Sequence, residues 1–133
     1  MSRSLIQTVN QSTQALTDNS IINLGAVQRR FGCNCRLDGN AITCIGEGYY
    51  TIDAGVSVTP TAAGPVTVAV FDNGVQIPGA IAYATGVANS PMTVQIPPAT
   101  IRQRCCSDAD VLTVVLIEGA GDVTNIAVRV EKV

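Results

Sequence analysis

The sequence contains no histidine and no tryptophan among its 133 residues. Without histidine, the chain lacks the commonest general base, the commonest zinc ligand and the usual partner of a catalytic serine or cysteine. Catalysis by two carboxylates remains, but no spacing singles out a pair among Asp53, Asp72, Asp108, Asp110 and Glu118. Each of these residues also suits an ordinary role in a turn or on a solvent-facing surface. We therefore predict that the protein is not an enzyme.

Charged residues are scarce as well, at 14% of the chain, and the net charge is −2. Proteins that bind nucleic acid carry clustered Lys and Arg, whereas the notable basic residues here are only Arg29, Arg30, Arg102 and Arg104. We expect no nucleic-acid partner. A weakly charged surface is either kept soluble by neutral polar groups or covered in part by sister subunits or a larger assembly.

Long apolar runs are absent too. No stretch approaches the roughly 18 consecutive apolar residues of a membrane span, so we expect no membrane partner. After Met1 the segment SRSLIQTVNQSTQ is polar and has neither the apolar region nor the cleavage site of a secretory signal. We expect a protein that is not exported by that route and that stays inside, leaves by lysis or is released within a particle.

What the sequence does contain is strand-like alternation, most plainly over residues 48–79. One face of the segment YYTIDAGVSVT collects Tyr50, Ile52, Ala54, Val56 and Val58, and the other face is mostly polar. A period of two residues is typical of a half-buried strand. The segment 65–71 repeats the pattern, and Asp72-Asn73-Gly74 then offers the positive-φ positions of a tight hairpin.

The remaining segments indicate more strands. Residues 1–20 are predicted to be an arm or edge strand rather than a short amphipathic helix, and residues 21–31 a strand in which Gly25 permits a bulge or a shift between sheets. Pro78-Gly79 predicts an edge position or a kink, and Pro97-Pro98 is expected to end strand pairing.

Residues 111–118 are apolar on both faces and predict a strand buried between two layers. Eight to ten short strands with no convincing helix indicate an all-β sandwich or barrel over residues 21–133.

Five cysteines form the one constellation that suggests metal or redox chemistry: Cys33, Cys35, Cys44, Cys105 and Cys106. Their spacing lacks the paired Cys-x-x-Cys of a structural zinc site. One interpretation is that they are buried, reduced thiols that pack as small hydrophobic residues. In the other, Cys105 or Cys106 meets Cys33 or Cys35 to form disulfides or a thiolate site.

Two acidic segments, Asp72-Asn73-Gly74 and Asp108-Ala109-Asp110, offer oxygen ligands of the kind that calcium prefers, but they lack the regular ligand spacing of a calcium loop. Turn formation accounts for them better. We therefore predict neither a metal ion nor another cofactor.

A resemblance adds to this interpretation. The segment GYYTIDAGVSVTPTAAGPVTVAVFDNGVQIPGA is followed by the adjacent cysteines and then by VTNIAVRVEKV. Over residues 20–133 this order resembles the small jelly-roll proteins of the complement-globular-head and tumour-necrosis-factor-like class found in bacteriophages and prophages of Firmicutes. It is also similar to the C-terminal domain of exosporium collagen-like glycoproteins, although their Gly-x-y stalk is absent here. The resemblance implies an antiparallel two-sheet jelly roll that forms a homotrimer and has no catalytic site.

Three functions follow from the resemblance. The first is a structural protein of a bacteriophage particle, a trimeric capsid decoration protein on the virion surface, whose residues 1–20 reach the major capsid protein, another virion protein or a neighbouring subunit. The second is a module of a fibre or tail that binds a host glycan or receptor, although three Tyr and two Phe provide little aromatic surface for it. The third is a bacterial spore or cell-surface protein.

Overall fold

The computed structural model describes residues 4–104 and 109–133, which form β-strands and no helix. The twelve strands are β1 (Ser4–Asn10), β2 (Gln14–Leu16), β3 (Ser20–Ile21), β4 (Ala26–Phe31), β5 (Cys35–Asp38), β6 (Ala41–Cys44), β7 (Gly48–Pro60), β8 (Gly64–Asp72), β9 (Val75–Gly86), β10 (Met92–Gln103), β11 (Asp110–Glu118) and β12 (Gly121–Lys132). Within these ranges no helix is present that could cross a membrane.

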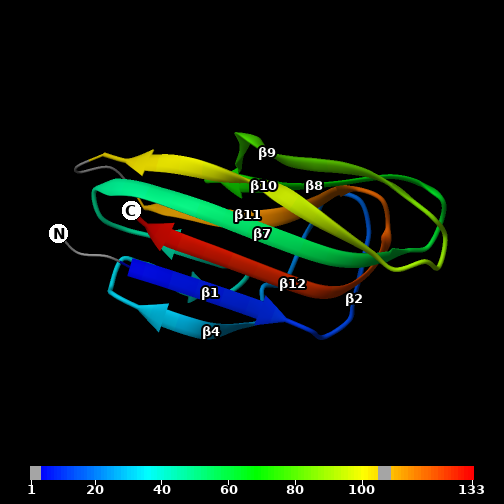
Figure 1. Ribbon diagram of the computed structural model, residues 1–133, viewed down its shortest axis with the longest axis horizontal. Helices are drawn as coiled ribbons and strands as arrows, with labels where there is room; N and C mark the ends of the chain where they lie inside the picture. Colours follow the sequence, from blue (N-terminus) through cyan, green and yellow to red (C-terminus); the bar gives the residue numbers. More distant parts are fainter. Residues whose placement is uncertain (1–3, 105–108) are drawn as a thin grey trace.

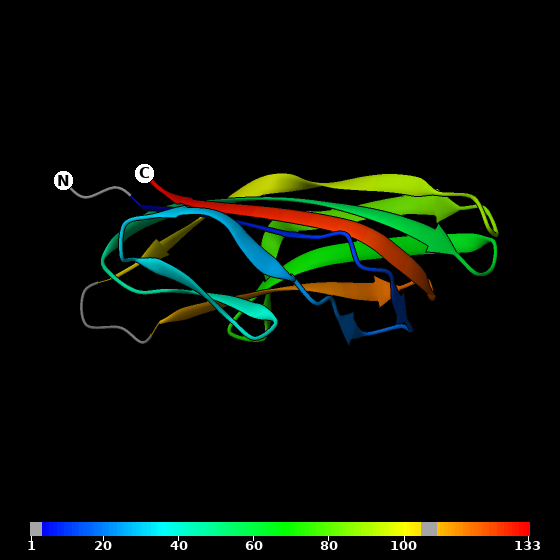
Figure 2. The same ribbon diagram turned by 90° about the horizontal axis from the view of Figure 1, so that it is seen from below.

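The strands form two sheets of six, and every pairing is antiparallel. Sheet A has the order β10-β7-β12-β1-β4, with β2 beside β12 (Figure 1). Sheet B has the order β5-β6-β11-β8-β9, with β3 beside β11. Figure 2 shows the sandwich from the side, with β12 in one layer and β11 in the other. The predicted all-β, two-sheet antiparallel fold is confirmed, with more strands than the eight to ten expected.

The core lies between the sheets and is built from alternate residues of each strand. On the predicted inward face of β7, the alternate residues from Tyr50 to Val58 are at most 2% exposed. The alternate residues of β8 from Val66 to Val70 are buried to the same extent. A sheet must bury one apolar face to be stable, and facing another sheet achieves this for both. The inward face predicted for residues 50–58 is therefore confirmed.

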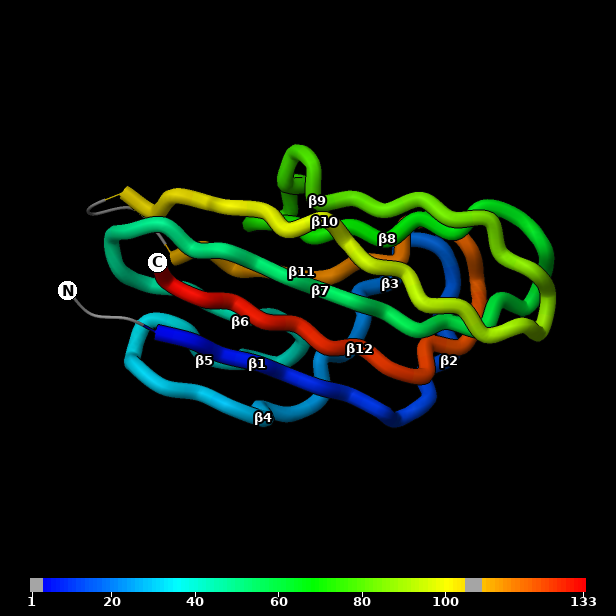
Figure 3. The backbone as a smooth tube through the Cα atoms, viewed as in Figure 1, coloured from blue at the N-terminus to red at the C-terminus, as the bar shows by residue number. Residues whose placement is uncertain are grey.

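The N-terminal segment differs from the expectation. Described from Ser4 onward, it forms β1, which pairs with β12 on one side and with β4 on the other. Ile6 of this strand is completely buried. A central strand needs hydrogen-bonding partners on both edges, and β4 supplies the second edge by returning beside β1, as the chain trace in Figure 3 shows. Residues 4–10 are therefore an internal strand of sheet A and not an arm or an edge strand.

Gly25 lies where the chain passes from one sheet to the other, which is one of the two roles predicted for it, a bulge or a shift between sheets. Before it, β3 pairs with β11 in sheet B, and after it, β4 pairs with β1 in sheet A. Its φ of +78° suits glycine, and a Cβ at this position would lie 2.4 Å from the carbonyl oxygen of Val9. The residue therefore permits both the backbone turn and the close approach of two strands.

The predicted hairpin at Asp72-Asn73-Gly74 is also confirmed. Asn73 and Gly74 have φ values of +52° and +83° and connect β8 directly to β9. Two consecutive positive values are what a two-residue turn needs to match the twist of the strands on either side.

The prolines have different outcomes. Pro78 lies in β9, the last strand of sheet B, so the predicted edge position is confirmed. Pro97-Pro98, in contrast, does not end the pairing, because β10 continues and pairs again with β7 from Ala99 onward. The register shifts between Ile96 and Ala99, so a bulge at an edge strand accommodates the two residues that cannot donate hydrogen bonds.

The strand β11 is buried on one face only, which corrects the expectation for residues 111–118. Leu112, Val114 and Leu116 face the core and are at most 3% exposed. The other face carries Val111, which is 36% exposed, and Val115, which is half-buried. The reason is that a single layer packs on sheet B within this chain, so the outward apolar residues of β11 have no second layer over them.

Neighbouring tyrosines of β7 test the assignment of faces. We expect Tyr50→Asp to lower the free energy of unfolding by about 4 kcal/mol or more, because it places a carboxylate in the core and removes a large buried ring. Tyr49→Asp is the matched control, since Tyr49 is 52% exposed, and we expect it to cost at most about 1 kcal/mol. Urea denaturation followed by circular dichroism measures both. Equal losses for the two variants would contradict the assignment.

Candidate functional site

At one end of the sandwich, five titratable side chains lie on the inward faces or at the border of the core, and we call them the end cluster. They are Cys35, Cys44, Tyr50, Asp72 and Asp110. Strand register brings them together. Cys35 is paired with Cys44, Cys44 with Asp110, and Asp72 with Leu112, the inward residue that follows Asp110 on β11.

Tyr50 closes the cluster from sheet A. Its hydroxyl donates toward the carbonyl oxygens of Ile45 and Gly46, at 3.1 and 2.8 Å. Burial, with smaller effects from the nearby cysteines, raises its pKa to about 12, so the hydroxyl stays protonated and continues to donate. Tyr50 thus fastens the connection between β6 and β7 across the end of the core.

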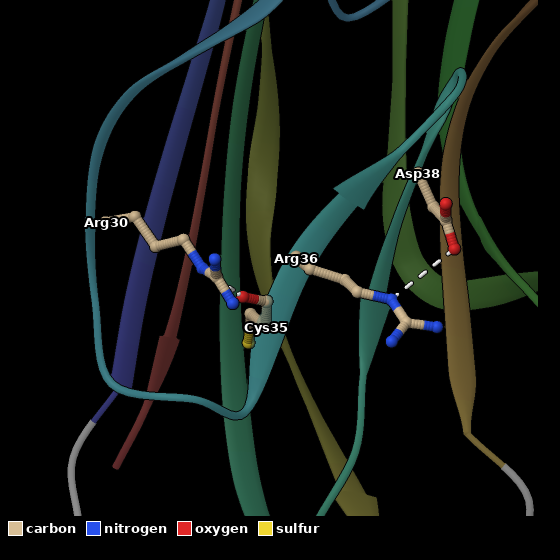
Figure 4. Close-up of polar contacts among 4 residues, drawn as sticks. All are labelled: Arg30, Cys35, Arg36 and Asp38. Carbon is tan, nitrogen blue, oxygen red and sulfur yellow. Dashed lines mark hydrogen bonds and ion pairs between the residues drawn. The ribbon is translucent and has the colours of Figure 1, made fainter.

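The two thiols of the cluster are in contact. The Sγ atoms of Cys35 and Cys44 lie 3.1 Å apart, and both residues are at most 1% exposed. Figure 4 shows Arg30 reaching over from β4, where its Nε donates to the carbonyl oxygen of Cys35 at 2.8 Å. The exposed ion pair of Arg36 and Asp38 lies further along the same hairpin, at 3.5 Å.

The surrounding charges make the two thiols unequal. The hydrogen bond from Cys44, supported by the charges of Arg30 and Lys132, lowers the pKa of the Cys35 thiol against the effect of burial. The same hydrogen bond, burial and the negative groups of Asp110 and Asp72 raise the pKa of Cys44. Cys35 is therefore the sulfur that loses its proton more readily as pH rises.

Three of the five cysteines in the predicted cluster lie within the described residues. Cys33 is exposed in the turn between β4 and β5, away from the buried pair. Cys105 and Cys106 lie outside the described residues, so the larger cluster stays a prediction. Within residues 4–104 and 109–133, no three Cys, Asp or Glu side chains are arranged to hold a metal ion.

The pairing of Cys35 with Cys44 was not predicted, although the sequence held a signal for it. The segment Leu37-Asp38-Gly39-Asn40 has the composition of a turn, and both cysteines are equally far from its centre at Gly39-Asn40. A two-residue hairpin loop fixes the register of the strands that it joins. Placing the turn one residue to either side would have separated the thiols, so the signal is real but weak.

Two carboxyls form the other half of the cluster. Asp110 is 9% exposed, and its Oδ2 and the Oδ1 of Asp72 are buried without a hydrogen-bond donor. Burial, a hydrogen bond with Asp110 and its negative charge together raise the pKa of Asp72 to about 7. Two ionised carboxylates cannot donate to each other, so a hydrogen bond between them requires that Asp72 keep its proton. The structure thereby selects one pair from the five acidic residues considered above.

Asp72 also borders a groove between β9 and β10. The groove encloses about 320 Å³ and has Ile77, Pro78 and Ile101 in its lining, with Arg102 at one side. The guanidinium of Arg102 lies 5.7 Å from the centre of the Tyr49 ring. A cation over an exposed aromatic ring, next to an apolar groove with an acid, is a combination suited to binding a small polar ligand.

The outer faces of the two sheets differ strongly. That of sheet A is polar, with residues such as Gln7, Asp53, Ser57, Gln95 and Arg129. The outer face of sheet B, by contrast, is apolar across β3, β11, β8 and β9 and consists of Ile21, Ala69, Phe71, Ile81, Tyr83, Val111, Val115 and Ile117, among threonines.

Exposure on this apolar face is high at its margins. Tyr83 is 74% exposed and Ile21 is 50% exposed, while Ala69 at its centre is covered completely by its neighbours. Three strands about 4.8 Å apart, each contributing some five residues, give a face of roughly 240 Å² in projection, and the two-residue β3 extends it at one margin. Contiguous apolar surfaces of this size often bind other proteins.

Comparison with known proteins shows the fold alone. No family model and no curated protein matches the sequence. The structure of murine APRIL at pH 5.0 superposes with a TM-score of 0.77 at 10% identity, over 99% of this chain and 100% of that one. The globular domain of zebrafish complement 1qA gives 0.70 at 10% identity, over 96% and 94% of the two chains. The PRD1 vertex protein P5 gives 0.66 at 11% identity, over 97% and 95%. The chain thus has the jelly-roll fold of the tumour-necrosis-factor-like and complement-globular proteins.

The raised pKa of Asp72 predicts how stability depends on pH. Asp72 has a pKa near 7 in the folded state and about 3.8 in the unfolded chain. Between these values the folded state binds more protons, so the free energy of unfolding falls as pH rises from about 4 to about 7. We expect Asp72→Asn to remove about 1–2 kcal/mol of that fall, because the amide is neutral and can still donate to Asp110.

Thermal melts at pH 5 and pH 8 measure this effect. The wild type should lose more stability between the two pH values than Asp72→Asn does. Asp38→Asn, on the exposed hairpin, is the control and should behave as the wild type. A wild type equally stable at both pH values would contradict the raised pKa of Asp72.

Proposed function

We propose that this chain is a non-enzymatic structural protein of a bacteriophage particle, a trimeric decoration protein on the capsid surface. The observation that carries the proposal is the apolar outer face of sheet B. In a chain with only 14% charged residues, the outward row that runs from Ile21 to Ile81 carries no charged side chain, and Glu118 borders the face at the end of β11. A surface of this kind is stabilised when another protein covers it.

The fold supports the same class of function. Its neighbours in structure include a protein named for the vertex of a particle, the PRD1 vertex protein P5. The jelly roll places many loops and broad sheet faces on a rigid core, which suits a protein that binds others in a repeated arrangement. The major capsid protein or another virion protein is the proposed partner, and the virion surface the proposed location.

Self-association has a physical motive as well. Sheet A ends at β4, whose six residues are all exposed, including Val27 and Phe31. An open strand edge with apolar side chains favours pairing with another protein. A closed threefold arrangement would cover such an edge in every subunit without leaving a free end that continues to associate.

Paired surface variants test this function. We expect the double variant Ile21→Glu/Tyr83→Glu, which places charge on the outer face of sheet B, to lower binding to capsids stripped of decoration by at least tenfold, or roughly 1.4 kcal/mol. The matched control is Thr93→Glu/Gln95→Glu on the exposed outer side of β10 in sheet A. Co-sedimentation with stripped capsids measures binding, and light scattering measures the mass of the free protein.

The two measurements separate the outcomes. A trimeric double variant that no longer binds capsids supports a capsid contact at this face, whereas a monomeric one places the contact between subunits. A wild-type chain that is monomeric, or that forms trimers and ignores capsids, would contradict the decoration function.

A second candidate function is recognition of a host glycan or receptor. It is favoured by one specific observation, the exposed Tyr49 ring beside Arg102 at the groove that Asp72 borders. An aromatic face packs against sugar rings, and charged groups nearby bind their hydroxyls.

A glycan-binding measurement distinguishes this candidate. If the groove binds sugars, Tyr49→Ala should weaken binding to host cells or to a bound glycan by about tenfold. Tyr83→Ala, at an exposed tyrosine on the outer face of sheet B, should leave it unchanged. Equal binding by the wild type and Tyr49→Ala would exclude the groove as the sugar site.

A further inference from the structure

We propose that Cys35 and Cys44 are a site of oxidative modification, at which a peroxide closes a disulfide between β5 and β6. The proposal does not depend on the function given above. It rests on where the hairpin places the two sulfur atoms, on their burial and on the charges around them.

The backbone geometry is the first argument. The amide of Ile45 donates to the carbonyl oxygen of Asn34 at 2.8 Å, so Asn34 and Ile45 are a hydrogen-bonded pair. Cys35 and Cys44, the next pair, are directly opposite each other and are therefore a non-hydrogen-bonded pair. In such a pair the Cα atoms are about 4.5 Å apart, which lies inside the range of about 4.4–6.8 Å that disulfides span.

The sulfur atoms already face each other. They are 3.1 Å apart, and a disulfide bond is about 2.0 Å long, so closure needs a movement of about 1 Å. A change of this size is within the reach of small side-chain rotations and does not require the strands to separate. Both side chains point into the core.

The charges select the sulfur that reacts first. Arg30 and Lys132 act on Cys35, whereas Asp110 and Asp72 act on Cys44. A thiolate is the nucleophile in thiol oxidation, and nearby cations stabilise it. Cys35 therefore attacks the oxidant, and Cys44, held as a thiol against it, resolves the product.

The chemistry balances in two steps with hydrogen peroxide as the oxidant. The Cys35 thiolate attacks one peroxide oxygen, the O–O bond breaks, and Cys35 becomes a sulfenic acid while hydroxide leaves. The Cys44 sulfur then attacks the Cys35 sulfur, the S–O bond breaks, and the oxygen leaves as water with the proton from Cys44. The two sulfurs lose two electrons in total, and the peroxide gains them.

Burial determines which oxidants can act. Both cysteines are at most 1% exposed, so a bulky disulfide compound cannot reach them as an oxidant unless the hairpin opens. Hydrogen peroxide is close to water in size, and β5 is the edge strand of sheet B and only four residues long. Small openings of a short edge strand are therefore enough to admit it.

The disulfide would fasten this edge strand. Residues 35–44 would become a closed loop, and the edge of sheet B could no longer separate from β6 at that end. The thiols persist in a reducing cytosol, and an oxidising environment favours the bond. The crosslink would thus stabilise the protein in an oxidising environment.

The test uses the full chain with the other three cysteines replaced, Cys33→Ser/Cys105→Ser/Cys106→Ser. After hydrogen peroxide, we expect the intact mass to fall by that of two hydrogen atoms and a peptide joining Cys35 to Cys44 to appear in the digest. Alkylation of the denatured protein should then find no free thiol. The melting temperature should rise by roughly 5 °C and return to its starting value with dithiothreitol.

Single variants identify the roles of the two sulfurs. In Cys44→Ser, dimedone should trap a sulfenic acid at Cys35, and in Cys35→Ser it should label Cys44 little. Peptide mapping of the oxidised wild-type chain provides the same information if the triple variant does not fold, with the exposed Cys33 as an internal standard for oxidation. Free Cys35 and Cys44 after Cys33 has been oxidised would overturn the proposal. So would a sulfinic acid at Cys35 in place of the crosslink.

Discussion

The burial of one face of each sheet against the other is the interaction on which the rest of this structure depends. Because side chains alternate along a strand, burying Tyr50, Ile52 and Val56 also decides where every other residue of β7 points. The same alternation runs along β6, β8 and β11 to their ends. At those ends it carries thiols and carboxyls inward, as at Cys44 and Asp110, so the end cluster is a consequence of core formation and strand register together.

The polar groups in the cluster compensate one another. Tyr50 donates to the backbone carbonyls of Ile45 and Gly46, and the two thiols share a hydrogen bond. The raised pKa of Asp72 lets it keep its proton beside Asp110, which relieves the repulsion of two nearby carboxylates. A buried polar group is tolerated only when such a partner is present. This arrangement keeps the end of the core closed while leaving titratable and oxidisable groups inside it.

The outer faces of the two sheets are the surfaces that a partner can contact. A polar outer face on sheet A and an apolar one on sheet B cannot both be explained by the fold of a single chain, since the fold requires only the inward faces to be apolar. The outward apolar residues of β11 and β9, such as Val115 and Tyr83, are therefore not required by the fold of a single chain. They are the basis on which a role in an assembly is proposed for this protein.

The sequence by itself determined the fold class, the strand pattern of residues 48–74 and the turn at Asn73-Gly74, because periodicity and turn propensity are local properties. It also carried the change of sheet at Gly25. It did not determine that Ser4–Asn10 is an internal strand, that β10 continues past Pro97-Pro98, or that β11 has an open face, because each depends on which strands lie alongside. The approach of Asp72 to Asp110 was likewise decided by the tertiary structure, whereas the pairing of Cys35 with Cys44 follows from the local turn between β5 and β6. Residues distant in sequence come together only through the register of strands, and register is fixed by the packing of the whole sandwich.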